Sequence, residues 1–249
     1  PKSHHNYRTM DLPIIVYGDS FSNPQSCQSQ PQEMWFRSAW PNSTVVFNRA
    51  RPGNSPQSMF LEATHDAVTR TDPTRLVVAL GPLFRLPRYE DGWFDQERLT
   101  DNRPEDGDPA QLADACELLK AVHHHDLQEL DAKTALHLTD MLHPTLLWSL
   151  LFQNVINLDA LCGQRGHELV VLHMNHRPDI DFRDRHVLVE PLWRAARETG
   201  SYWHTDHSCA QVCEQAGILP WDHDQYGMDG HHGPQGQRHF GSHMHDLIR

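Results

Sequence analysis

The chain has 249 residues, which is enough for one large domain or two small ones. At this length roughly 75% of the unfolded surface becomes buried, so the fold needs no disulfide or metal for its stability. The formal net charge of −12, from 21 basic and 33 acidic residues, argues against general binding to nucleic acids or anionic membranes, which requires a basic face.

Apolar, β-branched runs predict four strands in chain order, at residues 13–17, 44–48, 76–80 and 168–173. A weaker fifth candidate covers residues 201–204. The runs are continuously apolar and do not alternate with polar residues. This pattern is typical of strands that are covered on both faces, as in a parallel sheet.

Helical segments are predicted between these strands, and several have recognisable ends. Ser55 is an N-cap followed by a proline at the first helical position, and a very apolar helix runs from His143-Pro144 to about Leu161. A third helix spans apolar positions from Val187 to Ala196, and the last begins near Pro234. Alternating strands and helices predict an α/β fold.

One stretch interrupts this alternation. Residues 88–109 are rich in Asp, Gly, Pro and Asn without periodicity, which predicts a long surface loop. Residues 111–140 show the pattern of two amphipathic helices. We therefore expect a single domain over residues 1–249, with a loop and helical insertion, or lid, at approximately residues 86–143.

The first strand ends abruptly at Gly18-Asp19-Ser20, which can hold a serine hydroxyl at the carboxyl end of the sheet. A nucleophilic serine needs a histidine as its base and a carboxylate that orients the histidine. Aspartate precedes histidine by three residues twice, at Asp140 and His143 and at Asp229 and His232. The second pair is favoured because it follows all the strands and precedes the final helix.

Gly18-Asp19-Ser20 near one end of the chain and Asp-x-x-His near the other resemble the SGNH (GDSL-type) hydrolase family. The resemblance implies a flavodoxin-like three-layer α/β/α sandwich with a mainly parallel sheet of about five strands. It also implies a serine esterase or acyl hydrolase that forms an acyl-enzyme. Ser20 would be the nucleophile, His232 the general base and Asp229 the orienting carboxylate. Small-molecule or carbohydrate esters are the implied substrates, and no metal or organic cofactor is needed.

The same resemblance indicates the oxyanion donors. Gly53 follows the second strand, where the family has a glycine, so the backbone amides of Ser20 and Gly53 would hold the oxyanion. The family's third donor is an asparagine after the third strand, and Leu83 stands in its place here. A leucine cannot donate a hydrogen bond, so Asn54 or Arg85 is a candidate replacement.

Two further roles follow from this departure. Arg85 can alternatively bind a carboxylate of the substrate, and His231 is expected to face solvent or substrate. The missing donor also motivates a different hypothesis, in which the chain is a catalytically weak or inactive binding module on the same fold. Such a module would recognise a glycan or a protein partner.

The cysteines and histidines raise a separate question. Five scattered cysteines do not form a disulfide framework, and no segment reads as a signal peptide or membrane span, so a cytoplasmic protein is expected. His204, His207, Cys209 and Cys213 lie within ten positions, as zinc ligands can. Their spacing matches no finger pattern, and two helical cysteines also suit an apolar core. The sequence therefore assigns no metal site and no oligomeric state.

Overall fold

The chain was analysed as a computed structural model that describes residues 12–43, 46–52, 54–81, 89–90, 93–94, 144–174, 189–203, 205–222 and 230–248. Its centre is a parallel sheet of β1 (Ile14–Gly18), β2 (Val46–Asn48), β3 (Arg75–Leu80) and β6 (Glu168–His173). The strand order is β2-β1-β3-β6, and each neighbouring pair is parallel. All four predicted strands are confirmed, with their ends shifted by one or two residues.

The weak fifth strand is present only as an edge. Val171 and Tyr202 form an isolated parallel bridge, in which the Val171 N–H donates to the Ser201 carbonyl at 2.7 Å and the Trp203 N–H donates to the Val171 carbonyl at 2.8 Å. This segment lies beside β6 and completes the strand order of a flavodoxin-like sheet. The predicted fold class is therefore confirmed.

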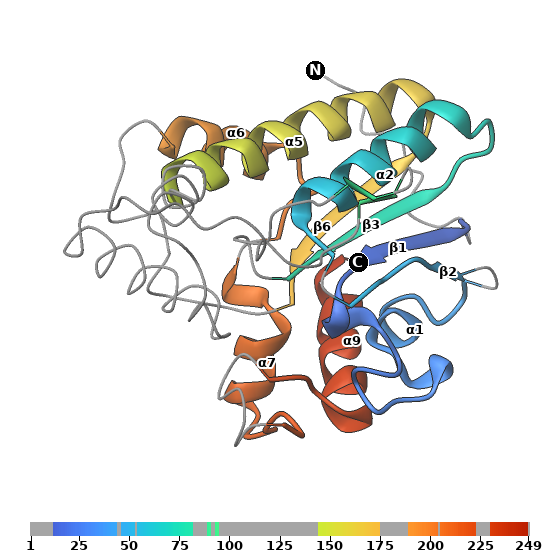
Figure 1. Cartoon of the computed structure of the whole chain (residues 1–249), viewed down its shortest axis with the longest axis vertical. Coiled ribbons are helices and arrows are strands. Elements are labelled where there is room, and N and C mark those ends of the chain that lie inside the picture. The colour runs from blue at the N-terminus through green and yellow to red at the C-terminus, as the bar shows by residue number, and fades with distance from the viewer. Residues whose placement is uncertain are drawn as a thin grey trace, which may run out of the picture.

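Helices cover both faces of the sheet, which gives three layers (Figure 1). One layer contains α2 (Pro56–Thr69), α5 (Pro144–Arg165) and α6 (Glu190–Glu198), and the other contains α1 (Trp35–Ala39), α7 (Cys209–Gln215) and α9 (Pro234–Ile248). Along β1, Ile15 and Tyr17 face the first layer, whereas Ile14 and Val16 face the second. Burial on both faces explains why the strands read as continuous apolar runs.

The helix ends follow from local chemistry. The Ser55 hydroxyl caps α2 by accepting a hydrogen bond from the Ser58 N–H at 3.2 Å, as predicted. Gly166 and Gly200, after α5 and α6, have φ angles of +77° and +75°, which only glycine adopts readily. The third predicted helix begins at Glu190, three residues later than Val187.

α5 has the length and apolar composition of a membrane-spanning helix over Thr145–Arg165 and is the one such helix among the described residues. Its apolar side chains pack instead into the first layer of the core, where Leu147, Trp148, Leu151, Phe152 and Val155 are all buried. One face of the predicted apolar helix therefore belongs to the core, whereas Leu146 and Leu150 on the same helix are exposed.

Within the predicted surface loop at residues 88–109, the structure describes one short antiparallel pair. β4 (Tyr89–Glu90) and β5 (Trp93–Phe94) are in register with Tyr89 opposite Phe94 and Glu90 opposite Trp93 in the backbone ladder. Two-residue strands leave no periodicity for a sequence pattern to detect. The predicted helices at residues 111–140 lie outside the described ranges.

Candidate active site

Ser20 occupies the turn that follows β1. It is the first residue of a short 3-10 helix, Ser20–Ser22, whose N-cap is Asp19. The Asp19 carboxylate accepts a hydrogen bond from the Phe21 N–H at 3.0 Å, while the Ser20 carbonyl accepts from the Asn23 N–H at 3.2 Å and from the Cys27 thiol at 3.4 Å. Ser20 is 8% exposed. A fixed backbone therefore holds its hydroxyl at the carboxyl edge of the sheet.

Two glycines make this turn possible. A Cβ at Gly81, directly after β3, would lie 1.7 Å from the Asp19 Oδ2 atom, and a Cβ at Gly18 would lie 2.8 Å from the Ser22 Cβ. β1 and β3 are parallel neighbours, and β2 lies on one side of β1 whereas β3 and β6 lie on the other. The order in which strands are added to the sheet therefore changes sides between β1 and β3, and this edge is the topological switch point of the fold. α/β proteins bind their ligands at this place.

A histidine–carboxylate pair lies next to the Ser20 turn. The Nδ1 atom of His231 is 2.7 Å from the Oδ2 atom of Asp222, and the His231 N–H donates to the Oδ1 atom of the same carboxylate at 2.5 Å. The side chain of Asp222 is 2% exposed and that of His231 is 18% exposed. A carboxylate acceptor places the proton on Nδ1, which leaves Nε2 as the basic nitrogen of the ring.

Aromatic contacts fix His231 against the residue after Ser20. The His231 ring is stacked on Phe21, with 4.8 Å between the ring centroids and 24° between the planes. Trp221 stacks at 6.4 Å from the His231 ring, and its indole N–H donates to the Ser26 carbonyl at 3.1 Å. The loop after Ser20 and the segment before α9 are therefore joined at the site.

The sequence did not identify Asp222. It predicted that His231 faces solvent or substrate, and that an aspartate three residues before His232 orients that histidine. Asp222 lies nine residues before His231 and follows no fixed spacing. The adjacent Trp221-Asp222 dipeptide, an aromatic and an acid within a polar loop, is the only local signal for it.

His232 lies in a different environment. It is 3% exposed, and neither of its ring nitrogens has a hydrogen-bond partner among the described residues. One ring nitrogen and the Sγ atoms of Cys209 and Cys213 all lie within 4.8 Å of one another. The adjacent Cys209 thiol, followed by the His232 imidazole, lowers the pKa of Cys213 to about 5, whereas burial raises the pKa of Cys209.

Asp229, the predicted partner of His232, lies outside the described ranges, as do Asp140 and His143. The predicted Asp229–His232 pair therefore stays a prediction. The sequence cluster of His204, His207, Cys209 and Cys213, to which the sequence assigns no metal, is described only in part. The Nδ1 atom of His207 is 3.3 Å from the Nε2 atom of His243 on α9, and His204 is also outside the described ranges.

Of the predicted oxyanion donors, Ser20 and Asn54 lie within the described ranges, whereas Gly53 and Arg85 do not. Leu83, which stands in place of the family's asparagine, also lies outside them. The amide of Asn54 is buried and donates to the Gly18 carbonyl at 3.4 Å. The Asn54 amide therefore lies beside Gly18, the last residue of β1, which precedes Ser20 by two residues.

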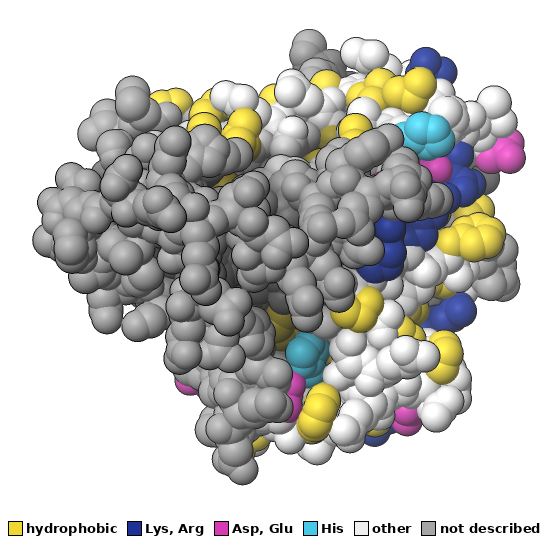
Figure 2. All heavy atoms as spheres, in the orientation of Figure 1, with side chains coloured by type: hydrophobic (Ala, Val, Ile, Leu, Met, Phe, Trp, Pro, Cys, Tyr) yellow, Lys and Arg dark blue, Asp and Glu magenta, His cyan; other side chains and the backbone are white. Residues whose placement is uncertain are grey.

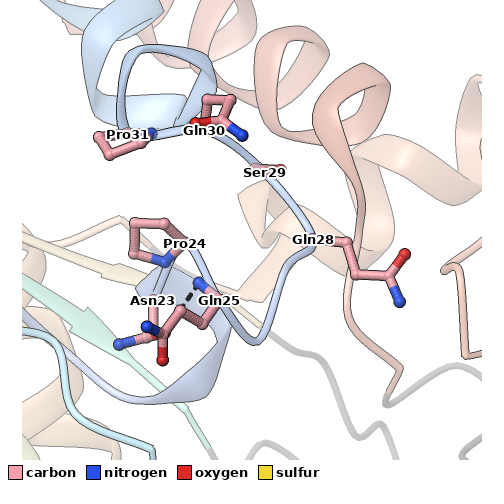
Figure 3. Close-up of a pocket in the computed structure, with 7 residues that line it drawn as sticks. All are labelled: Asn23, Pro24, Gln25, Gln28, Ser29, Gln30 and Pro31. Carbon is pink, nitrogen blue, oxygen red and sulfur yellow. Dashed lines mark hydrogen bonds between the residues drawn. The ribbon is translucent and has the colours of Figure 1, made fainter.

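Two surface features are separate from this site. Figure 3 shows a pocket lined by one loop, in which Asn23 and Pro24 lie across from Gln30 and Pro31, and neither Ser20 nor His231 lines it. Figure 2 shows basic side chains gathered over the β2 edge of the sheet. The arginines there are paired: Arg49 with Asp66 at 2.8 Å, Arg70 with Asp66 at 3.5 Å, and Arg51 with Glu62.

The chain matches no family model and no curated protein. Three solved structures are similar to it. The psychrotrophic esterase EstA from Pseudoalteromonas sp., inhibited by monoethylphosphonate, has a TM-score of 0.49 and 11% identity over 95% of this chain and 96% of that one. A member of the lipolytic protein G-D-S-L family from Veillonella parvula has a TM-score of 0.44 and 15% identity, over 93% of this chain and 94% of that one. TesA has a TM-score of 0.45 and 12% identity, over 95% of this chain and 97% of that one.

EstA and the Veillonella protein are named as an esterase and as a G-D-S-L family member.

Proposed function

We propose that this chain is a serine hydrolase of carboxylic esters, in which Ser20 is the nucleophile, His231 the general base and Asp222 the carboxylate that orients it. One observation carries the proposal. A buried aspartate binds both the ring and the backbone of His231, and that ring is stacked on the residue that follows Ser20.

The arrangement suits acyl transfer. As Ser20 attacks an ester carbonyl, its proton passes to the Nε2 atom of His231, and the Asp222 carboxylate stabilises the imidazolium that forms. The imidazolium then protonates the leaving alcohol, and an acyl-Ser20 ester remains. A water molecule gives up a proton to His231 and attacks this ester, which releases the carboxylic acid and restores the Ser20 hydroxyl.

The oxyanion formed in each step needs hydrogen-bond donors. The backbone N–H groups of Ser20 and Gly53 are the proposed donors. The third is the side chain of Asn54, whose amide has two N–H bonds, of which one is directed to the Gly18 carbonyl. Asn54 would replace the asparagine whose place Leu83 takes. Its position at the end of β1 supports this role.

The histidine pair offers one rival within the same reaction class. In the rival arrangement His232 is the base and Asp229 orients it, as the family spacing implies. The position of His232 favours His231 as the base instead. The ring of His232 lies beside the thiols of Cys209 and Cys213, whereas that of His231 is paired with a carboxylate.

The test of the reaction class is Ser20→Ala, assayed with p-nitrophenyl acetate and with a fluorophosphonate probe. We expect hydrolysis to fall by at least about 10⁴-fold, because loss of the nucleophile removes the covalent route. Ser149→Ala is the matched control, since Ser149 lies on α5 in the opposite helix layer and bonds only to the Thr145 carbonyl in the described part of the chain. Unchanged turnover in Ser20→Ala, or an unlabelled and folded wild type, would favour the binding module.

A further inference from the structure

Cys209, Cys213 and His232 form a compact buried group that adjoins His231 in the chain but includes none of the proposed catalytic residues. Each of the three is at least nine-tenths buried, and one potential ligand atom from each lies within 4.8 Å of the other two. Both cysteines are free thiols. The mechanism proposed above uses none of the three.

The chain folds so that these side chains meet. Ser208 caps α7 by accepting from the Gln211 N–H at 3.2 Å, and the two cysteines follow at a four-residue spacing on one helix face. His232 stands just before α9, and α7 packs against α9. The group therefore joins two elements that are separate in the sequence.

The imidazole of His232 gives the strongest indication that this group binds a ligand. Buried polar nitrogens are almost always hydrogen-bonded, yet neither of its ring nitrogens has a partner with full hydrogen-bond geometry in the described ranges, and the Cys213 thiol is the polar group that interacts with the ring. An apolar role for Cys209 and Cys213 would explain the two thiols but not a buried imidazole within 4.8 Å of both. A metal ion would satisfy one nitrogen directly.

Charge and distance both suit such an ion. Two thiolates and a neutral imidazole around a divalent cation sum to zero, which is the favourable case for a buried site. Tetrahedral zinc, with bonds of about 2.3 Å to sulfur and about 2.0 Å to nitrogen, places its ligand atoms about 3.5–3.8 Å apart. Shifts of about 1 Å or less bring the three atoms from their present separations to that geometry.

We propose that Cys209, Cys213 and His232 bind one thiophilic metal ion, with Zn²⁺ as the probe. The two thiols release their protons to solvent when the ion binds, and the ion's remaining coordination position accepts water or a further donor. The bound ion fastens α7 to the start of α9, directly beside His231. This ligand set replaces His204 and His207, which the sequence grouped with the two cysteines.

The first experiment measures metal in the unmodified protein. After expression with added zinc and removal of loosely bound ions, we expect one zinc per chain by elemental analysis. Replacement by Co²⁺ should give thiolate-to-cobalt charge-transfer absorption, and chelation should lower the melting temperature. A wild type with neither stoichiometric metal nor a cobalt–thiolate spectrum would overturn the proposal, and this result needs no variant to fold.

The second experiment assigns the ligands. Cys213→Ser and His232→Ala should each weaken zinc affinity by more than about 100-fold. Loss of a residue that only hydrogen-bonds to a ligand costs up to about 100-fold, so a larger loss identifies a direct ligand. Cys162→Ser is the matched control, because Cys162 is equally buried but lies in the opposite helix layer. His207→Ala should also retain the metal. Full loss of metal in either control, or full retention in His232→Ala, would contradict this ligand set.

Discussion

His231 and His232 are adjacent in the chain but belong to two different regions of the molecule. His231 is bound by the carboxylate of Asp222 and stacked on Phe21, next to the Ser20 turn. His232 is buried against the thiols of Cys209 and Cys213. Successive side chains of a non-helical segment point in different directions, so one residue step separates the proposed proton-transfer group from the proposed metal ligand.

Spacing and contacts point to different members of this histidine pair. The Asp-x-x-His pattern selects His232, whereas hydrogen bonding and stacking select His231. His231 has an aspartate as its partner, and His232 has a pair of thiols. The partner determines what each imidazole can do. Substitutions can therefore separate the two regions.

The largest expected effect distinguishes the two histidines directly. His231→Ala should lower kcat/KM for p-nitrophenyl acetate by about 10⁴-fold or more, since the base is lost. The loss in His232→Ala should be at least about 100-fold smaller, and the same two proteins should be assayed for zinc. The reverse order of activities would make Asp229 and His232 the catalytic pair.

Asp222→Asn should cause the next largest loss, about 10³- to 10⁴-fold in kcat, because an amide no longer holds the imidazole in the right tautomer. Steady-state kinetics and circular dichroism measure activity and folding together. Asp72→Asn, at an exposed position outside the site, is the control. A larger loss in Asp229→Asn than in Asp222→Asn would contradict the proposed pair.

Asn54→Ala should lower kcat by about 100- to 1000-fold with a smaller change in KM, as expected for an oxyanion donor. The chain should remain folded, because the amide makes one long hydrogen bond to Gly18. If KM rises while kcat is unchanged, Asn54 binds substrate and is not the oxyanion donor. The donor that Leu83 displaces would then have no replacement in Asn54.

Gly236→Ala tests the packing on the His232 side. A Cβ there would lie 2.7 Å from the Cβ of His232, so we expect a loss of about 1–3 kcal/mol in unfolding free energy and weaker zinc binding. Gly163→Ala is the matched control, because its Cβ would meet nothing within 4 Å. Alanine inside a helix should be neutral or stabilising there. Equal stability of the two variants would contradict this packing of His232.

The smallest effect concerns His167, a buried histidine that has a protein partner. Its Nδ1 atom accepts from the Thr74 N–H at 3.2 Å. Burial lowers its pKa below 6.5, as do the charges of Arg70 and Arg165, whereas hydrogen bonds with the backbone of Arg70 and Ala67 partly oppose the shift. A depressed pKa means that the unfolded state binds the proton first. Its contribution to stability is therefore full above about pH 6.5 and is lost as the pH falls, by less than about 1.4 kcal/mol per pH unit. Urea unfolding of wild type and His167→Gln at pH 7.5 and 5.5 measures this, and parallel pH dependences would contradict it.

Much of the fold could be predicted from the sequence because its signals are local. Continuous apolar runs identified all four strands, and Ser55 identified the start of α2. The short helix α1 and the β4–β5 pair gave no signal, since a single helical turn or a two-residue strand has no measurable period. The turn around Ser20 was predicted because Gly18 and Asp19 act within a few residues of it.

The proposed site was harder to predict because its parts come from distant segments. Asp222 reaches His231 from a loop, and no rule fixes the number of residues between them. His232 meets Cys209 and Cys213 only because α7 packs against α9. Such contacts depend on tertiary structure, so neither composition nor spacing contains them.

The side chain of Gln237 has a consequence for how the protein is made. Its amide donates to the Phe21 carbonyl, 216 residues away in the chain, at 3.3 Å, and its oxygen accepts from the Trp35 N–H at 3.2 Å. The ribosome thus releases the nucleophile turn long before the segment that holds it against His231. Under the proposed mechanism, a nascent chain therefore gains the capacity for catalysis only when α9 docks.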